Sequence, residues 1–215
     1  MAARGGGGGL IVTHLLRGAA CQARRAPQTR RMKPTSLDDV LNAYREHGHR
    51  AYGESVTELE HALQCATFAQ RAGEPPVVVA SALLHDYGHL CHQLGEDIAD
   101  HGVDARHEDL GANLLRDLFV DAVVDAARLH VAAKRYLCWK DPGYADGLST
   151  ASRKSLHLQG GPMTATEAQE FEREPQHDLA VRVRRYDDLG KVPGMTTPDL
   201  EAFRPLLEAF LRPVR

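Results

Sequence analysis

The sequence lacks the features that would place it in several specialised classes of protein. Its 215 residues contain no apolar run of about 18 residues, the length that a membrane-spanning helix needs. Its four cysteines form no CxxC pair, so we expect neither a thiolate zinc site nor a disulfide framework, and we expect a cytoplasmic location. The net charge of -3 shows no basic excess. We therefore expect neither a nucleic acid nor a membrane among its partners.

Residues 1–33 differ in composition from the rest of the chain. They contain the glycine run Gly5–Gly9 and seven basic side chains but no acidic one, which leaves 19 basic and 29 acidic residues in the remainder. Such a segment is typical of a targeting peptide or of a disordered extension, and translation starting at Met32 is a further alternative. We expect residues 1–33 to lie outside the fold and residues 34–215 to form one domain.

Helix signals follow one another from Ser36 onward, and no segment shows the period-two alternation of a strand. Thr57 and Thr164 each begin a capping-box pattern, and Pro75-Pro76 stands where proline starts a helix well. The expected helices cover 37–47, 58–72, 77–84, 105–118, 121–134, 165 onward, 178–191 and 198–211, with Thr197 as the last cap and a turn-rich stretch at 141–161. The prediction is an all-α bundle of six to eight helices, with 77–84 buried at its centre.

The sequence contains 12 histidines, and His85 stands next to Asp86 at the end of the most apolar helix. Burying two ionisable groups there is costly unless something compensates them, and a metal ion would do so. Side chains that follow one another on a helix point about 100° apart, so both can reach one metal while the second carboxylate oxygen binds another. A hydrogen-bonded pair in the core is the alternative. His89 follows His85 by one turn on the same face.

Other candidate ligands are distributed one per predicted helix. They are His61, His107, His130 and Asp187. Facing helices of a bundle supply metal ligands in this way. Together with His85 and Asp86 they exceed what one metal needs, which favours two metals that share Asp86.

The segment Leu83-Leu84-His85-Asp86-Tyr87-Gly88-His89, preceded by His61, resembles the HD-domain superfamily, most of whose members are phosphohydrolases. The additional histidines His107 and His130 are similar to those of a smaller branch, related to inositol oxygenase, that holds two mixed-valent irons and activates dioxygen. Within this branch, the chain resembles the HD oxygenases of phosphonate catabolism. The matching segments lie at 52–54, 57–64, 130–137, 158–163, 185–188 and 191–194.

The resemblance implies two iron ions, Fe(II) and Fe(III), with O2 as the co-substrate. One iron would be held by His61, His85, Asp86 and Asp187, and the other by Asp86, His107 and His130. The implied reaction cleaves the carbon–phosphorus bond of a 1-hydroxy-2-aminoethylphosphonate-type substrate. It releases phosphate and a carboxylic acid such as glycine.

The resemblance also implies how the substrate is bound. The phosphonate would be held by His89, Lys134, Ser152 and Arg184. Glu54 would face the amine, and Tyr52 would occupy the place of the substrate on iron in the resting enzyme. With the bridging Asp86, Tyr52 and Glu54 make up the expected catalytic set.

The chemistry of these side chains agrees with an anionic substrate. Lys134 lies four residues after His130 and thus on the same helical face, beside the metal, where an anion between the two cations would compensate their repulsion. Lys134 and Arg184 both have the alternative of a solvated surface charge. Ser149, Thr150 and Ser155 are alternatives to Ser152.

Two other functions stay open from the sequence. A metal-dependent phosphohydrolase would activate water, would work with redox-inactive metals and would not need His107 and His130. A non-catalytic HD module that senses a phosphorylated or phosphonate ligand would lack one of the metal ligands, whereas all six are present here.

Overall fold

The computed structural model describes residues 33–52, 55–91 and 106–213. These residues contain no β-strand, only two isolated bridges. They form ten α-helices and two short 3-10 helices: α1 Leu37–His47, α2 Glu58–Arg71, α3 Pro76–Leu84, α4 Tyr87–Cys91, α5 His107–Leu115, α6 Asp121–Lys140, η2 Ala145–Gly147, α7 Thr150–Leu158, α8 Ala165–Phe171, α9 His177–Leu189, η3 Leu200–Phe203 and α10 Arg204–Glu208. The fold class is all-α, as predicted.

Two of the sequence predictions concern parts of the chain that the structure does not describe. The expected extension, residues 1–33, lies outside the described residues except for Lys33, and so does Glu54. Both remain predictions. No helix in the described ranges combines the length and the apolarity that crossing a membrane requires.

Helix starts are where the sequence was most informative. Ser36 caps α1, and the Thr57 and Thr164 side chains cap α2 and α8, each with the full capping box. Pro76 is the first residue of α3, in which every residue from Val78 to Leu84 is buried. The predicted central position of this helix is confirmed.

The described residues contain two helices more than the upper limit of the predicted six to eight, namely α4, which has only five residues, and α7. The stretch 141–161 is not only turn, since it contains α7. The Ser149 side chain caps this helix, and Gly160 and Gly161 with positive φ follow it. Buried Leu148 and Leu156 pack it onto α6, a contact that the polar composition of the stretch conceals.

The ends of two other helices also differ from the prediction. Helix α6 continues to Lys140 rather than 134, because Tyr136 packs against Phe171 of α8 with ring centroids 5.0 Å apart. The last helix does not begin at Pro198. Asp199 caps a 3-10 turn instead, and α10 starts only at Arg204, next to Pro205, which lacks the N–H for a continuous helix.

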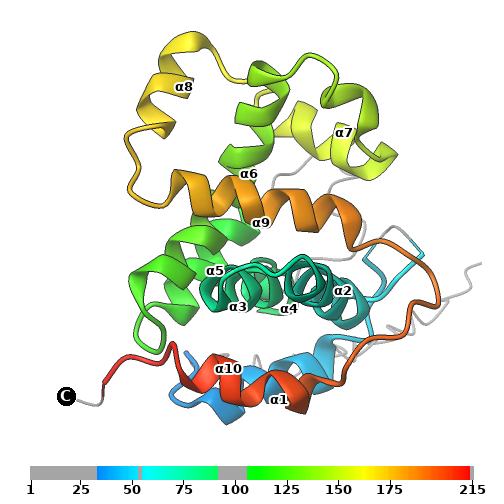
Figure 1. Ribbon diagram of the computed structural model, residues 1–215, viewed down its shortest axis with the longest axis vertical. Coiled ribbons are helices and arrows are strands. Elements are labelled where there is room, and N and C mark those ends of the chain that lie inside the picture. The colour runs from blue at the N-terminus through cyan, green and yellow to red at the C-terminus, as the bar shows by residue number, and fades with distance from the viewer. Residues whose placement is uncertain (1–32, 53–54, 92–105, 214–215) are drawn as a thin grey trace, which may run out of the picture. The chain divides into compact units, whose positions relative to one another are not determined.

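Helix α3 is at the centre, where α2, α6 and α9 pack around it (Figure 1). Helix α1 packs on α2 and α4, and α10 on α3. The large core cluster joins α1–α6 and α9 with the C-terminal segment. The C-terminal half of α6 extends beyond this core, where α8 and α7 cover it with two smaller apolar clusters (Figure 1). Because α3 is apolar on all sides and lies in the core, the residues that follow its last turn, His85 and Asp86, are buried as well.

Gly88 and Gly111 let α4 and α5 approach closely. A Cβ atom on Gly88 would overlap the main-chain oxygen of His107 and lie 2.9 Å from the nitrogen of Gly111. A Cβ atom on Gly111 would lie 3.0 Å from the nitrogen of Gly88. The contact is between main chains, which cannot rotate away as a side chain can. It sets the distance between the His85-Asp86 turn and His107.

We expect Gly88→Ala to lower the free energy of unfolding by about 3 kcal/mol, the upper end of the usual overpacking range, because main-chain atoms must move. Denaturant unfolding followed by circular dichroism measures this change. Gly147→Ala is the control, since nothing lies within 4 Å of the added carbon. Equal unfolding midpoints for the two variants would contradict the role of this contact.

Candidate metal centre

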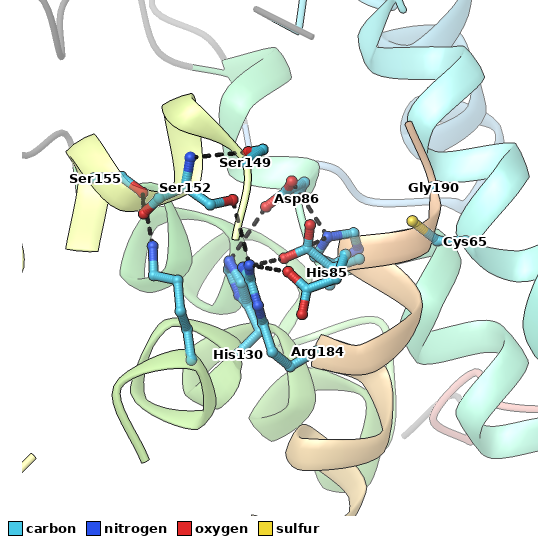
Figure 2. A network of polar contacts seen from close by, with 12 residues as sticks. Cys65, His85, Asp86, His130, Ser149, Ser152, Ser155, Arg184 and Gly190 are labelled. Atoms are coloured by element: carbon cyan, nitrogen blue, oxygen red, sulfur yellow. Dashed lines mark hydrogen bonds and ion pairs between the residues drawn. The ribbon is translucent and has the colours of Figure 1, made fainter. Parts of the chain in front are cut away.

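Asp86 lies in the turn between α3 and α4, and four histidines converge on its carboxylate. Figure 2 shows Asp86 with two of them, His85 and His130. Its Oδ2 atom lies 3.2 Å from His85 Nε2 and 3.4 Å from His61 Nε2. Its Oδ1 atom lies 3.2 Å from His130 Nε2 and 3.4 Å from His107 Nε2. Each carboxylate oxygen therefore faces its own pair of imidazoles.

Main-chain carbonyls orient three of these imidazole rings. The Nδ1 atom of each ring donates to one carbonyl oxygen: His61 to Gly190 at 2.8 Å, His85 to Ala82 at 2.9 Å, and His130 to Ala127 at 2.7 Å. Because a carbonyl oxygen only accepts, Nδ1 carries the hydrogen and Nε2 of the neutral ring presents a lone pair. Metal-binding histidines are commonly oriented by such bonds.

This arrangement fits cations between the rings. His61 Nε2 and His85 Nε2 lie 3.3 Å apart, and in the neutral rings neither atom has a hydrogen to donate. Asp86 Oδ1 is buried and has no hydrogen-bond partner among the described residues. Positive charge on both sides of Asp86 would compensate the facing lone pairs and the unpaired oxygen. Imidazoles with carboxylates are a donor set for divalent transition metals.

The ionisation of the centre agrees with this conclusion. Burial raises the pKa of Asp86, but His85 and the other imidazoles outweigh this effect and hold the pKa well below its usual range. Burial lowers the pKa of His85, but the Asp86 carboxylate outweighs it and raises the pKa to about 9. A proton therefore takes the place of a metal on His85 at neutral pH, and metal binding would release it.

Asp187 comes to the same centre from α9. Its Oδ1 atom lies 3.6 Å from His61 Nε2, and its Oδ2 atom lies 3.9 Å from His85 Nε2. Arg184, one turn earlier, forms an ion pair with Oδ2. Burial raises the pKa of Asp187, but the charges of Arg184 and Lys191 hold it well below its usual range. The carboxylate is thus ionised and beside the first pair of histidines.

Tyr52 lies over the half of the centre that contains His61. Its ring stacks on the His61 ring with centroids 3.8 Å apart, and its hydroxyl donates to Asp86 Oδ2 at 2.9 Å. The hydroxyl is also 3.4 Å from Asp187 Oδ1. Burial raises the pKa of Tyr52 well above its ordinary value, so the phenol is protonated.

His89 lies on α4 at the other half of the centre. Its ring stacks on the His107 ring with centroids 3.9 Å apart. One of its nitrogens lies within 4.8 Å of ligand atoms of Asp86 and His107. The structure therefore brings His89 to the centre, next to the metal-ligand candidates.

Cys65 was not among the sequence candidates, yet it follows His61 by one turn of α2. Its Sγ atom lies 3.6 Å from His61 Nε2, and together with His85 the two form a group that could hold a metal. Burial raises the pKa of the Cys65 thiol well above its ordinary value. A neutral thiol is a poor ligand, so we favour the carboxylates.

Lys134 is a buried cation, only 3% exposed. Its Nζ atom donates to Ser155 Oγ at 2.7 Å, and it forms no ion pair with a carboxylate of the described residues. Burial, together with the charge of Arg184, lowers its pKa to about 8. An anion beside Lys134 would compensate its burial.

Arg184 is also buried, so it is not the solvated surface charge that the sequence left open. Its guanidinium pairs with Asp187 and Asp188, lies 3.1 Å from the Tyr144 hydroxyl, and reaches Ser152 Oγ at 3.4 Å. Ser152 is buried on α7, with its side chain toward the Arg184 guanidinium (Figure 2). The predicted phosphonate-binding residues Ser152 and Arg184 are therefore in contact.

Sequence reasoning missed the second hydroxyl and a third cation of this cluster. Ser155 was considered only as an alternative to Ser152, whereas the structure gives each serine a different cation. Lys191 donates to Ser152 Oγ at 3.1 Å. The sequence contained a signal for this contact, because Lys191 follows Asp187 by four residues. This spacing places two side chains on the same face of a helix.

These observations define a helical protein with a buried histidine–aspartate metal centre and an adjacent cluster of cations. The HD domain model matches residues 59–190, a range that includes all six candidate ligands. The chain belongs to the HD-domain family, and within it is related to the phosphonate dioxygenases. The resemblance expected from the sequence is thus confirmed.

Two curated relatives support this relationship. The chain is 46% identical over 156 residues to a [1-hydroxy-2-(trimethylamino)ethyl]phosphonate dioxygenase (glycine-betaine-forming) of Leisingera caerulea, covering 73% of this chain and 80% of the relative. It is 42% identical over 192 residues to a hydroxymethylphosphonate dioxygenase of Gimesia maris, covering 89% of this chain and 94% of the relative. An uncharacterized mimivirus protein is 33% identical over 179 residues, 82% of each chain.

We expect Lys134→Met to stabilise the metal-free protein at pH 7. The folded pKa of about 8 lies below the ordinary 10.5, so the unfolded state binds more protons between these values. Stability of the wild type should therefore rise with pH across that window, and the variant should lack the rise. The gain at pH 7 should be on the order of 3 kcal/mol, because each pKa unit corresponds to about 1.4 kcal/mol.

Denaturant unfolding at pH 7 and pH 10 measures this difference. Lys154→Met is the control, because Lys154 is exposed on α7. Parallel pH profiles for the wild type and Lys134→Met would show that the burial of Lys134 carries no such cost.

Proposed function

We propose that this protein is an iron-dependent dioxygenase that cleaves the carbon–phosphorus bond of a hydroxyphosphonate. The observation that carries the proposal is the division of the Asp86 carboxylate between two pairs of histidines. A phosphohydrolase that activates water at one metal would have no use for the second pair, His107 and His130. Both relatives with an assigned activity are named as phosphonate dioxygenases.

The ligands would divide between the two irons as the resemblance implies. One iron would be held by His61, His85, Asp86 and Asp187, and the other by Asp86, His107 and His130. A mixed-valent Fe(II)/Fe(III) pair would supply the redox chemistry with O2, which zinc or magnesium cannot. The chain itself keeps the imidazoles oriented through Nδ1 and keeps Asp86 ionised.

The cation cluster would bind and orient the phosphonate. Lys134 and Arg184 offer charge-assisted donors, and the Ser152 hydroxyl can donate as well. His89 would approach the same ligand from α4. Because Arg184 also holds Asp187, the phosphonate would be fixed relative to a candidate iron ligand. Such positioning places the carbon that bears phosphorus next to the centre.

Tyr52 would occupy the substrate position when substrate is absent. Its hydroxyl already lies at the Asp86 and Asp187 oxygens, and its ring covers His61. With Tyr52 displaced, the half of the centre beside His61 would be open to the substrate hydroxyl.

The rest of the substrate is the part on which the two relatives differ. One name includes a trimethylamino group, and the other describes hydroxymethylphosphonate, which has no amine. Both include the hydroxyphosphonate. The reaction with O2 converts the carbon that bears phosphorus into a carboxylic acid and releases phosphate. For an amine-bearing substrate, Glu54 would face the amine, and a primary amine would give glycine.

Iron loading followed by electron paramagnetic resonance tests the metal centre. Partial oxidation of the anaerobically loaded protein should produce the signal of a coupled mixed-valent pair. The same protein should consume O2 and hydroxymethylphosphonate and release phosphate. Removing an iron ligand costs at least as much as removing its supporting hydrogen bond, so His130→Ala should lower this activity more than about 100-fold and abolish the signal.

The controls separate the alternative functions. His157→Ala changes an exposed histidine on α7 and should leave both the signal and the activity intact. Activity of His130→Ala or of zinc-loaded protein on phosphate esters would favour a phosphohydrolase. Binding of phosphonate by the iron-loaded protein without any turnover would favour a sensing module.

A further inference from the structure

Lys191 follows directly after α9 and Gly190, and only 11% of its side chain is exposed. Its Nζ atom donates to Ser152 Oγ at 3.1 Å. The nearest Asp187 oxygen is farther, at 3.8 Å, which is too long for a hydrogen bond. The ammonium also lies 5.8 Å from the centre of the Tyr52 ring. Its close partner is therefore a neutral hydroxyl rather than a carboxylate.

Two cations meet at that hydroxyl. Ser152 Oγ is contacted by Lys191 and, at 3.4 Å, by Arg184. One turn further along α7, Ser155 Oγ accepts from Lys134. The face of α7 with Ser152 and Ser155 thus collects three positive side chains, as Figure 2 shows for Arg184 and the serines. Like charges this close repel one another unless an anion lies between them.

The carboxylates of the described residues leave part of this charge uncompensated. Arg184 pairs with Asp187 and Asp188, and Lys191 shares Asp187 at the longer distance. In the proposed function, Asp187 also donates to iron. Lys134 forms no ion pair with a carboxylate of the described residues. A ligand with two negative charges, such as a phosphonate, would compensate this excess.

The main chain on both sides of Lys191 is held in place by α2. Gln64 Nε2 donates to the Val192 oxygen at 2.9 Å, and the Val192 nitrogen donates to Gln64 Oε1 at 2.8 Å. The Gly190 oxygen accepts from His61 Nδ1. A Cβ atom on Gly190 would overlap Cys65 Sγ, so this close approach needs glycine. Lys191 is thus held from both neighbours, unlike a lysine in a free loop.

We propose that Lys191 is a third phosphonate-binding cation, which acts together with Lys134 and Arg184 at the two serines of α7. The inference rests on the proposed function, because it assigns a further contact to the same substrate. In the bound state, the Lys191 ammonium donates to a phosphonate oxygen at the place where it now donates to Ser152. The Ser152 hydroxyl then donates its own hydrogen to the anion.

Anaerobic binding measurements on the iron-loaded protein test this assignment, because no turnover occurs without O2. The probes are hydroxymethylphosphonate and inorganic phosphate, titrated by calorimetry into wild type, Lys191→Met, Lys191→Arg and the control Lys154→Met. A charge-assisted hydrogen bond is lost in Lys191→Met, so its Kd should rise about tenfold or more for both probes. Lys191→Arg should recover most of the affinity, and Lys154→Met should match the wild type.

Iron content separates this role from support of Asp187. If Lys191 binds the anion, Lys191→Met should retain iron, and with O2 its KM should rise more than its kcat falls. A weaker affinity of Lys191→Met for iron, with an unchanged Kd for phosphonate once the variant is saturated with iron, would overturn the proposal.

The outcome for wild type distinguishes the two proposals. Wild type that binds hydroxymethylphosphonate but does not consume it with O2 would contradict the proposed function. The role of Lys191 in binding would then still be decided by the Kd values of the Lys191 variants. Wild type that turns over the substrate while Lys191→Met binds it equally well would overturn only the role of Lys191.

Discussion

The burial of the Asp86 carboxylate is the constraint on which the rest of the structure depends. The all-round apolar helix α3 carries this group into the interior, where an ionised carboxylate is costly without nearby positive charge or donors. Three helices contribute imidazoles that face it: His61 from α2, His107 from α5 and His130 from α6. The packing of the bundle therefore supplies the donors that the buried Asp86 carboxylate needs, and the same imidazoles could bind a metal.

A second feature is the coupling between the metal centre and the cation cluster. Arg184 contacts Asp187 on one side and Ser152 on the other, so the carboxylate beside the histidines and the anion site share one guanidinium. The loop after α9 adds a second connection, since Gly190 orients His61 while the next residue, Lys191, reaches Ser152. A bound phosphonate would thus be aligned with the metal centre through short, buried contacts.

The sequence predictions were correct where local patterns decide the structure and wrong where packing decides it. The predicted capping boxes at Thr57 and Thr164 depend on residues three apart, and both are found at the first turns of α2 and α8. Helix α7 was missed because Leu148 and Leu156 are buried against Cys138 of the preceding helix α6, a contact that the polar composition of the stretch does not reveal. Most of the described fold could therefore be predicted, except where packing rather than local pattern decides.

The sequence by itself determined the candidate ligands and the all-α class, because both follow from residue type and from short-range spacing. Only the tertiary structure decided that each Asp86 oxygen faces its own pair of histidines, and that Ser155 pairs with Lys134 while Ser152 pairs with Lys191. These facts depend on side-chain direction across helices far apart in sequence. Helix packing sets such directions, and no local pattern records them.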